Sequence, residues 1–315
     1  MAAARWTAED IPDLSERTAV VTGANSGIGL ACAVELARHG ATTVLACKDL
    51  RRGEAAMVRI KEQAPDATVE LRQLDLADLT AVRAFASEIR VAHPTVDILL
   101  NNAHLMATPR LLTADGFELQ LGINHLGHFA LTGLLLPCLL AARSARVVTV
   151  TSMLHTAGHI DFDDLMGERT YGPWRAYAQS KLANLLFAFE LARRAAHDGD
   201  ARYRLVSVAA HPGFTATNLP AIGPQIRGRA WLKRVSTRVA AVAGQSAEQG
   251  ALPALYAATA ADVRPGDFIG PGGYGGIRGG PARVRPHAKA CAEDVARALW
   301  DRSEELTGVR YDELR

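Results

Sequence analysis

Tyr177 and Lys181 are the side chains of this sequence whose types and spacing best suit proton transfer. They lie four residues apart, so on a helix both project from the same face. A phenol with an ordinary pKa of about 10 exchanges a proton poorly at neutral pH, and a nearby cation can lower that pKa. Lysine is scarce, with five against thirty arginines, and no other tyrosine has a lysine four positions later. The pair therefore predicts an acid–base site in which the ammonium group lowers the pKa of the phenol.

A glycine-rich segment, residues 22–29, reads Thr-Gly-Ala-Asn-Ser-Gly-Ile-Gly. It follows the apolar run 18–21 and precedes an amphipathic stretch, 30–39, so it lies where a strand turns into a helix. Glycines let the backbone turn tightly and approach a pyrophosphate closely, and the N–H groups at the helix start bind the anion. The segment predicts a dinucleotide-binding loop.

Short apolar runs alternate with longer helical patterns along the whole chain. This alternation is typical of a parallel sheet with helices on both faces. We therefore expect the α/β class, with a single Rossmann-type doubly wound domain and a seven-stranded parallel sheet. The expected strands are 18–22, 42–47, 68–74, 96–101, 145–151, 203–209 and 266–270, and the expected helices are 27–39, 51–63, 78–92, 112–142 (broken), 174–197, 246–260 and 290–304.

Three segments are longer than the connections that the expected strands and helices need, although the whole chain, 1–315, is expected to form one domain. They are the loop 153–173, the segment 211–245, and a tail, 271–315, that begins with a glycine-rich loop. Long loops at the carboxyl ends of strands usually shape a ligand site. We expect 211–245 to be the substrate lid.

Composition excludes several classes of partner. A formal net charge of +2 gives no electrostatic basis for binding nucleic acid or an anionic membrane. The first ten residues lack the apolar core of a secretory signal, and the longest apolar stretch, 130–142, is shorter than the roughly 20 residues of a membrane span. The four cysteines are too widely spaced for a metal site or a disulfide framework. We expect a cytoplasmic protein with no bound metal, no membrane anchor and no nucleic-acid partner.

The two motifs together resemble those of the short-chain dehydrogenase/reductase superfamily. Residues 22–29 match its Thr-Gly-x-x-x-Gly-x-Gly pattern, and residues 177–181 match its Tyr-x-x-x-Lys pattern. Segments 45–49, 124–129 and 180–184 further resemble the retinol-dehydrogenase-like branch and its bacterial relatives. Membrane-bound members of that branch carry an N-terminal hydrophobic anchor, and we expect none here, because the first residues show no such apolar run. The resemblance therefore implies a soluble reductase of the bacterial type.

The resemblance implies a catalytic tetrad of Asn124, Ser152, Tyr177 and Lys181. Tyr177 takes the place of the general acid/base, and Lys181 the place of the lysine that also holds the nicotinamide ribose. Ser152 stands where the family's serine hydrogen-bonds the substrate oxygen, with Thr151 as the alternative. Asn124 matches the asparagine that anchors a water in the proton relay, and the alternative is an asparagine that only caps a helix kink.

The resemblance also implies a nicotinamide dinucleotide as cofactor. Its contacts are expected from Gly23, Asn25, Ser26, Gly27, Ile28, Gly29, Lys48, Asp75, Leu76, Asn102, Ala103, Tyr177, Lys181, Pro212, Gly213, Thr215 and Thr217. Asp75 can alternatively be a plain helix N-cap. Cys47 stands where NAD-dependent relatives carry an acidic residue, and Lys48 follows it. Because a thiol does not repel a 2′-phosphate and a cation attracts one, we expect NADP(H) to be preferred over NAD(H), unless Lys48 is merely solvated.

Together these residues predict an NADP(H)-dependent oxidoreductase that transfers a hydride between nicotinamide and a carbonyl or secondary alcohol. Aromatic residues in the loops, Phe162, Trp174, Phe214 and Trp231, favour a hydrophobic ketone or alcohol as the substrate. One alternative is a nucleotide-sugar epimerase or dehydratase, which shares Tyr-x-x-x-Lys but has a large C-terminal substrate domain. Another is a non-catalytic dinucleotide-sensing regulator. The presence of all four tetrad residues argues against this alternative. The sequence is also compatible with a homo-oligomer.

His104 departs from the family pattern, because the Asn-Asn-Ala-Gly motif that begins at Asn101 normally ends in glycine. An imidazole at this position can turn to solvent or to a neighbouring loop as a tolerated substitution. Alternatively it lines the substrate side, where its donor and acceptor can select a polar group on the substrate.

Overall fold

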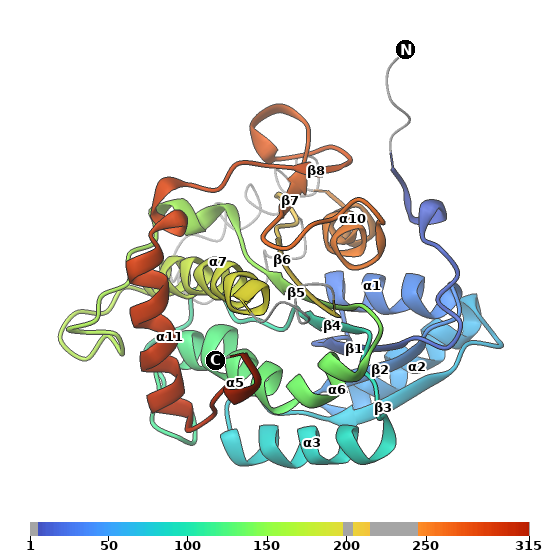
Figure 1. The fold of residues 1–315 in the computed structure, drawn as a ribbon, viewed down its shortest axis with the longest axis horizontal. Helices are drawn as coiled ribbons and strands as arrows, with labels where there is room; N and C mark the ends of the chain where they lie inside the picture. Colours follow the sequence, from blue (N-terminus) through green and yellow to red (C-terminus); the bar gives the residue numbers. More distant parts are fainter. Residues whose placement is uncertain (1–5, 198–203, 215–244, 315) are drawn as a thin grey trace, which may run out of the picture.

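The computed structural model describes residues 6–197, 204–214 and 245–314. Within these residues an eight-stranded sheet forms the centre of the molecule, in the order β3-β2-β1-β4-β5-β6-β7-β8 (Figure 1). The strands are β1 (Thr18–Thr22), β2 (Thr42–Cys47), β3 (Val69–Gln73), β4 (Ile98–Asn101), β5 (Ala145–Val150), β6 (Leu205–Ala210), β7 (Phe268–Pro271) and β8 (Pro281–Arg283). Strands β1 to β7 pair in parallel, and β8 pairs antiparallel with β7.

The α/β class and the doubly wound Rossmann-type sheet are confirmed, whereas the predicted number of seven strands is wrong. The additional strand, β8, lies in the segment 271–315 that the sequence indicates as a tail. Proline and glycine surround this three-residue strand, so it shows no alternating or continuous apolar pattern. Strands β1 and β4, in the middle of the sheet, are buried at every position. Burial on both faces explains why they read as continuous apolar runs.

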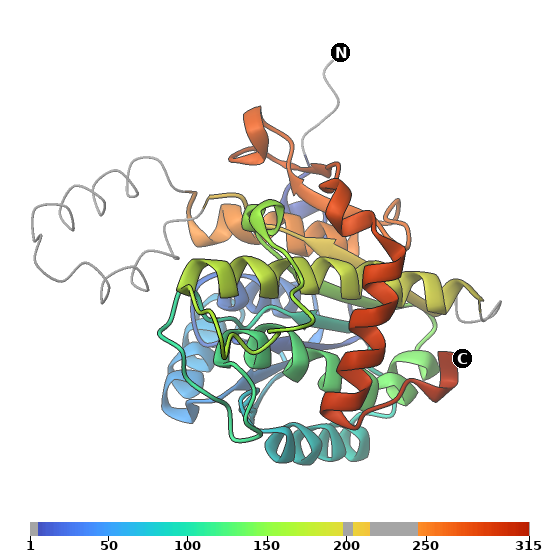
Figure 2. The ribbon, with the colours of Figure 1, turned by 90° about the vertical axis from the view of Figure 1, so that its left-hand side faces the viewer.

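Helices cover both faces of the sheet (Figure 1). One apolar cluster joins the sheet to α1 (Gly27–Arg38), α2 (Leu50–Gln63) and α10 (Ala247–Thr259). A second cluster joins the opposite face to α3 (Leu79–Ala92), α5 (Gly127–Leu134), α6 (Leu136–Ala141) and α7 (Pro173–His197). Figure 2 shows α11 (Glu293–Thr307) lying across α7. Among the described residues, no helix is long and apolar enough to cross a membrane.

Short polar side chains fix where several helices begin. Asp49 accepts a hydrogen bond from the N–H of Arg52 at the start of α2, and Asp78 accepts from two N–H groups at the start of α3. Ser246 caps α10 in the same way. Helix α1 is different, because Ser26 stands at its N-cap position without a side-chain hydrogen bond. The first N–H groups of α1 are therefore left for another acceptor.

The expected helix 112–142 is shorter than predicted and is interrupted by a π-helical turn. Residues 112–118 form no helix, and the helical part begins with α4 (Leu119–Leu121). It continues as a π-helical turn, Gly122–Leu126, before α5. A π-turn inserts one residue into the helical ladder and often marks a functional site. Here the π-turn contains Asn124. The next residue, Gly127, packs closely against the chain after β3, because a Cβ added there would lie 2.6 Å from the Leu76 carbonyl oxygen.

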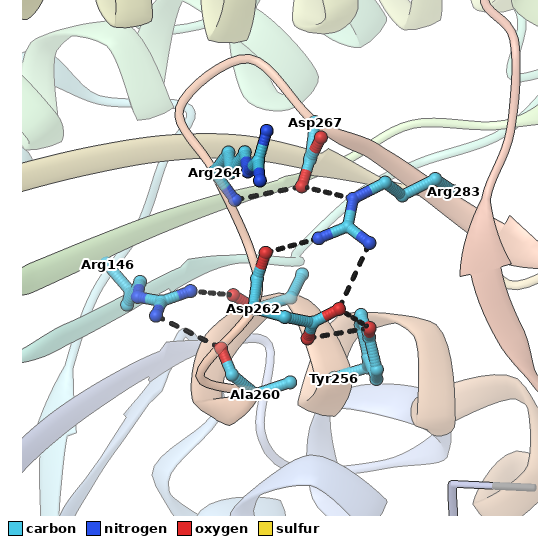
Figure 3. Close-up of polar contacts among 8 residues, drawn as sticks. Arg146, Tyr256, Ala260, Asp262, Arg264, Asp267 and Arg283 are labelled. Carbon is cyan, nitrogen blue, oxygen red and sulfur yellow. Dashed lines mark hydrogen bonds and ion pairs between the residues drawn. The ribbon is translucent and has the colours of Figure 1, made fainter.

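Figure 3 shows how polar contacts attach β8 to the neighbouring elements. Arg283 on β8 donates from Nε to Asp267 Oδ2 at 2.9 Å and from Nη1 to Asp262 Oδ2 at 3.0 Å. Both carboxylates lie in the segment between α10 and β7, and the hydroxyl of Tyr256 on α10 donates to Asp262 at 2.8 Å. These bonds lower the pKa of Asp262, with the Tyr256 bond as the largest cause. Arg283 thus supplies the anchoring that a short strand lacks.

An aromatic cluster fixes the C-terminal part of the chain to the helices on one face. Trp300 of α11 is almost fully buried and packs edge-on against Phe129 of α5, with ring centroids 5.2 Å apart. It also stacks on Phe187 of α7. Tyr311 packs on Trp300 at 4.5 Å and donates from its hydroxyl to the Phe129 carbonyl at 2.7 Å. The C-terminal segment therefore packs against α5, the helix that follows the π-turn.

Candidate active site

A cleft of about 710 Å³ opens at the carboxyl ends of β1, β2, β3 and β4. Ligands of open α/β sheets bind at this edge, where the strand order reverses direction. Eleven residues of the cleft wall are among those expected to contact a dinucleotide: Gly23, Asn25, Ser26, Gly27, Ile28, Gly29, Lys48, Asp75, Leu76, Asn102 and Ala103. His104, which the sequence singled out as a departure from the family pattern, also lines the cleft, and the sequence did not indicate the remaining wall residues: Ala46, Asp49, Arg52, Leu74, Leu105 and Ile123. The structure therefore brings together residues from four separate strand ends.

The glycine loop has a backbone that side chains would disturb. Gly23 has a φ of +66°, and a Cβ added there would lie 3.0 Å from the Cα of Ala103. Gly29 is packed more tightly, because its added Cβ would lie 2.5 Å from both Asn102 Nδ2 and the carbonyl oxygen of Gly23. These contacts hold the start of α1 directly against the end of β4. Glycine is thus required for close approach of backbone to backbone.

The cleft fits a dinucleotide on two further observations. The uncapped N-terminus of α1 faces the cleft, and such a terminus attracts a phosphate group. Asn102 lines the same cleft, and its Oδ1 is buried without a hydrogen-bond partner among the described residues. Its Nδ2 already donates to the Thr22 carbonyl at 2.8 Å. An acceptor left in this position suits a ligand that carries hydroxyl or amide donors.

Two cations, Lys48 and Arg52, and two carboxylates, Asp49 and Asp75, lie where the cleft meets the ends of β2 and β3, which we call the adenosine end because the family pattern places the dinucleotide's 2′ position there. Lys48 forms an ion pair with Asp75 at 2.8 Å, although its side chain is 70% exposed. Arg52, on the first turn of α2, lines the same part of the cleft. Burial raises the pKa of the Cys47 thiol to about 11, so the thiol carries no charge at neutral pH. Asp75 is not the N-cap of α3, a role that Asp78 fills.

Tyr177 and Lys181 lie on one face of α7, as their spacing predicts. Both side chains are almost fully buried, with 2% and 1% exposure. The Lys181 Nζ lies 5.7 Å from the centre of the Tyr177 ring and donates to the Val150 carbonyl at 3.2 Å. Asn184, one turn further along α7, donates to the same carbonyl at 3.1 Å. The lysine head group is therefore held at the end of β5.

The structure distinguishes Ser152 from its neighbour Thr151. The Thr151 hydroxyl donates to the backbone carbonyl of Lys181 at 2.6 Å, so its proton is used in packing β5 against α7. The Ser152 hydroxyl lies close enough to the Tyr177 phenol to lower the pKa of that phenol. It also accepts from the N–H of Leu154 at 3.3 Å. Of the two hydroxyls, only that of Ser152 is placed to act together with the phenol.

The π-turn directs the Asn124 side chain into a set of hydrogen bonds. Its Oδ1 accepts from the N–H of Leu105 at 2.8 Å, and its Nδ2 donates to the Leu105 carbonyl at 2.9 Å. The same Nδ2 donates to the hydroxyl of Ser180 at 2.9 Å, and that hydroxyl donates to the Tyr177 carbonyl at 2.8 Å. Asn124 therefore connects the loop after β4 to the turn of α7 that carries the phenol.

Burial controls the ionisation of the two central groups. It raises the pKa of Tyr177 to about 12, and the interaction with Ser152 acts in the opposite direction. Burial also lowers the pKa of Lys181 to about 7, because a charged ammonium is poorly solvated there. The sequence led us to expect a phenol pKa lowered by the lysine. The structure shows the reverse direction, since the loss of water around the phenol outweighs the other effects.

The predicted residues that follow β6 lie outside this cleft or outside the described part of the chain. Pro212 and Gly213 follow β6 at the same edge of the sheet but are not part of the cleft wall. The Pro212 carbonyl accepts from Gln245 Nε2 at 2.9 Å, and a Cβ at Gly213 would lie 2.4 Å from the Ile277 carbonyl oxygen. Thr215, Thr217, Trp231 and most of the expected lid 211–245 lie outside the described residues.

His104 is half-buried and forms part of the cleft wall. Its Nδ1 donates to the Asn102 carbonyl at 2.9 Å, which turns the ring back along the end of β4. Nearby, Met106, Ala107 and Tyr177 form a small apolar cluster of their own. Trp174 packs edge-on against Tyr177 at 6.4 Å and is 41% exposed. The phenol is therefore bordered by apolar and aromatic groups.

Comparison with known proteins agrees with this geometry. The sequence profile of the short chain dehydrogenase family matches residues 17–222. Human retinol dehydrogenase 13 is 41% identical over 301 residues, which are 95% of this chain and 87% of that protein. Mouse retinol dehydrogenase 14 is 38% identical over 303 residues, 93% of this chain and 86% of that protein.

Solved structures show the same architecture. An uncharacterised protein from Mycobacterium paratuberculosis has a TM-score of 0.79 and 43% identity, covering 98% of this chain and 99% of that one. A short chain dehydrogenase from Shigella flexneri, solved in complex with NADP, has a TM-score of 0.61 at 24% identity, covering 81% of this chain and 97% of that one. The second likeness concerns the fold alone. The chain belongs to the short-chain dehydrogenase/reductase superfamily, in its retinol-dehydrogenase-like branch.

Proposed function

We propose that this chain is an NADP(H)-dependent oxidoreductase that transfers a hydride between nicotinamide and a carbonyl or alcohol group. The observation that carries the proposal is the buried pair on α7, in which the Lys181 Nζ lies 5.7 Å from the centre of the Tyr177 ring, with Ser152 beside the phenol. Hydride transfer to a carbonyl needs a proton donor at the developing alkoxide and a second donor to hold that oxygen. A nicotinamide supplies the hydride when it is bound.

Tyr177 is the proposed proton donor, and its ionisation favours the reductive direction at neutral pH. Because burial raises the pKa of Tyr177 to about 12, the phenol keeps its proton and can give it to an alkoxide. Alcohol oxidation needs the phenolate, so its rate should increase as the pH rises. Ser152 can donate to the substrate oxygen while it accepts from the phenol. Lys181 is the proposed partner that restores the proton to the phenol, and burial lowers its pKa to about 7.

The preference for NADP(H) over NAD(H) rests on the charges at the adenosine end of the cleft. Lys48 and Arg52 both line it, and the Cys47 thiol is neutral. Two cations attract a 2′-phosphate more strongly than a 2′-hydroxyl. Asp75 neutralises part of this charge through its ion pair with Lys48. We therefore propose that Arg52 supports Lys48 in phosphate binding.

The proposed substrate is a hydrophobic ketone, aldehyde or alcohol. Met106, Ala107 and Trp174 lie against Tyr177 and present apolar surface next to the phenol. Relatives that are about 40% identical are named retinol dehydrogenases, and retinol is a long apolar alcohol. The same relatives do not favour a nucleotide-sugar epimerase or dehydratase, the first alternative.

The deciding experiment follows the oxidation of NADPH and, in parallel, of NADH by the purified chain. The carbonyl panel should include short ketones, long-chain aldehydes and all-trans-retinal. We expect carbonyl-dependent consumption of NADPH that is fastest with the apolar substrates. An epimerase would use its dinucleotide without net oxidation, and a dinucleotide-sensing regulator would bind NADPH with no turnover on the whole panel. Either result would overturn the proposal.

A further inference from the structure

His128, the second residue of α5, lies between the dinucleotide cleft and the π-turn. Its side chain is 1% exposed and none of the residue types or spacings in the sequence indicated a role for it. The Nδ1 atom lies 3.1 Å from the backbone carbonyl oxygen of Asn124. The Nε2 atom lies 2.9 Å from the hydroxyl oxygen of Thr22, the last residue of β1. One imidazole therefore bridges two parts of the site that are a hundred residues apart in sequence.

The partners of this ring fix its protonation. A backbone carbonyl only accepts, so Nδ1 carries the proton and donates to Asn124. The Thr22 hydroxyl has two lone pairs, and the N–H groups of Asn102 and Ala103 occupy them at 2.9 Å each. Its own proton therefore points to Nε2 at 2.9 Å, with the Leu100 carbonyl as a more distant acceptor at 3.2 Å. A proton on Nε2 would have no acceptor here.

Electrostatics favours the same neutral form. Burial is the largest of the causes that lower the pKa of His128 to about 3, and the positive charge of Lys181 acts in the same direction. A cationic imidazole at this place would face the lysine without a counter-charge. The ring is therefore a neutral connector with one donor and one acceptor, each of which has a partner.

The bond to Thr22 leads to the cleft wall alone, whereas the bond to Asn124 leads to the turn that carries Tyr177 and, through Leu105, also to the cleft wall. On the Thr22 side, the hydroxyl holds the N–H groups of Asn102 and Ala103, which form part of the wall of the dinucleotide cleft. On the Asn124 side, the amide side chain holds Leu105 and Ser180, and Ser180 donates to the Tyr177 carbonyl. Hydrogen bonds on both sides of His128, joined through the covalent structure of Asn124, thus connect the wall of the cleft with the turn that carries the phenol.

We propose that His128 is a positioning residue that sets the π-turn with Asn124 at a fixed distance from the dinucleotide cleft. This inference rests on the proposed function, because it assigns one bond to dinucleotide binding and the other to turnover. The bond to Thr22 keeps the end of β1 and the end of β4 in register for the dinucleotide. The bond to the Asn124 carbonyl keeps the π-turn in place beside Tyr177. Neither bond touches the substrate.

Two conservative substitutions separate the two bonds. In His128→Asn the amide nitrogen can occupy the Nδ1 position and donate to Asn124, but the side chain is too short for Thr22. In His128→Gln the amide oxygen can reach Thr22 and accept its proton, while the donor to Asn124 is lost. We expect His128→Gln to lower kcat by up to about 10²-fold with a nearly unchanged Kd for NADPH, since small misplacements of catalytic groups have effects of this size. We expect His128→Asn to weaken NADPH binding by about 10-fold, the effect of one lost hydrogen bond, with kcat closer to wild type.

His125 provides a matched control in the same π-turn. It is also a buried histidine, but its Nε2 contacts Ser303 of α11 at 2.9 Å, and its Nδ1 has no partner among the described residues. The substitutions His125→Asn and His125→Gln should lower Tm and leave kcat and the Kd for NADPH close to wild type. If the His128 variants change kcat and Kd together, in proportion to their loss of Tm, the imidazole is only part of the core and the proposal is wrong.

A measurement on the wild-type chain tests the geometry without any variant or turnover. The ¹⁵N chemical shifts of the His128 ring at pH 7 distinguish a proton on Nδ1 from one on Nε2 and from the cation. We expect the neutral form with Nδ1 protonated, and either other form overturns the inference. If the wild type neither binds NADPH nor turns over, the proposed function fails, while the ring shifts still decide how His128 is bonded. If the wild type is active and the two substitutions do not separate kcat from Kd, the inference alone fails.

Discussion

At the scale of single residues, the proposed proton transfer depends on the buried phenol of Tyr177. Among the described residues, Ser152 is the side chain whose interaction lowers the pKa of this phenol, and it follows β5, where Lys181 bonds the Val150 carbonyl. A proton leaving Tyr177 must therefore pass to a ligand beside Ser152 or to Ser152 itself. On this geometry we propose that the phenol, and not the lysine, is the group that acts on a substrate oxygen.

The substitution Tyr177→Phe should lower kcat by about 10² to 10⁴-fold, the usual effect of losing a general acid. The ring remains, so its contacts with Met106 and Trp174 persist and the Kd for NADPH should change little. Steady-state turnover and fluorescence titration with NADPH measure the two quantities. Tyr256→Phe is the matched control, because that hydroxyl bonds Asp262 and neither residue lines the cleft. Turnover near wild type in Tyr177→Phe would contradict the assignment.

Lys48 should discriminate between the two nicotinamide dinucleotides. We expect Lys48→Ala to weaken NADPH binding by about 10-fold, which corresponds to one charge-assisted hydrogen bond, and to leave NADH binding unchanged. Calorimetric titration of both dinucleotides measures this difference. Lys61→Ala serves as the control, because Lys61 at the end of α2 donates to the Ala67 and Pro65 carbonyls. Equal affinities of the wild type for NADPH and NADH would remove the basis for the preference.

His104 should influence which substrates the site accepts. It belongs to the cleft wall, and its ring lies beside the carbonyl of Asn102. We expect His104→Gly to change the relative kcat/KM of bulky and small ketones while the Kd for NADPH stays the same, since glycine removes bulk without altering the pyrophosphate loop. A series of ketones of increasing size measures the ranking. An unchanged ranking would leave His104 as a tolerated substitution.

At the scale of elements, the start of α1 is the part of the site that tolerates change least. A Cβ at Gly29 would meet Asn102 Nδ2 and the Gly23 carbonyl oxygen at 2.5 Å, so Gly29→Ala must push α1 away from β4. We expect a loss of about 1–3 kcal/mol in the free energy of unfolding, as for other overpacked positions, together with weaker NADPH binding. Chemical denaturation and NADPH titration measure the two effects.

Gly172→Ala is the control for this prediction. A Cβ there would meet only Arg175 Cβ, at an ordinary contact distance of 3.6 Å. We expect it to leave both stability and NADPH affinity nearly unchanged. A Gly29→Ala variant with the stability and affinity of Gly172→Ala would show that α1 can move without consequence.

The strands and helices that carry strong periodicity were predictable from the sequence, whereas the irregular elements were not. The predicted segment 18–22 coincides with β1, and 42–47 with β2, because burial on both faces leaves an uninterrupted apolar run. The π-turn at Gly122–Leu126 was not predictable, since its residues fit an α-helix equally well. Its position is set by tertiary contacts, above all those of the Asn124 side chain with Leu105.

The residues of the site likewise include some that the sequence predicted and some that it did not. Glycine residues of the loop were recognisable, because the backbone geometry that they permit leaves a fixed spacing in sequence. Arg52 and His128 were not recognisable, because a charged residue on a helix reads as solvated and a histidine in an apolar run reads as core. Each reaches the site only through the fold: Arg52 because α2 begins at the end of β2, and His128 because α5 follows the π-turn. No local pattern carries that information.

At the scale of the whole molecule, the buried Lys181 should make stability depend on pH. Burial lowers its pKa from 10.5 in the unfolded chain to about 7 in the folded one. Below pH 7 the ammonium is charged in both states, so the cost of burying it is fully present. As the pH rises from 7 towards 10.5, the folded state releases the proton while the unfolded state keeps it, and the free energy of unfolding increases.

The substitution Lys181→Met should therefore raise Tm in the absence of dinucleotide while it abolishes turnover. The carbonyl of Val150 keeps a donor in the variant, because Asn184 also bonds it. We expect the gain in Tm to be larger at about pH 6.5 than at about pH 9.5. At the higher pH the buried lysine of the wild type is mostly neutral, so its burial destabilises the folded state less. Thermal unfolding at both pH values measures the difference. A gain that does not depend on pH, or a loss at both, would contradict the expectation.

The two outermost strands of the sheet have a consequence for how copies of this chain can meet. At one edge, β3 carries Glu70 and Arg72, so an added strand would face charged side chains. At the other edge, β8 spans three residues, begins with Pro281, which lacks an N–H donor, and includes Arg283. Short, charged or proline-containing edges discourage a neighbouring chain from extending the ladder. Growth of the sheet from one molecule into the next is thereby disfavoured at both edges of the described sheet, and we expect contacts between copies, where they occur, to form on other surfaces.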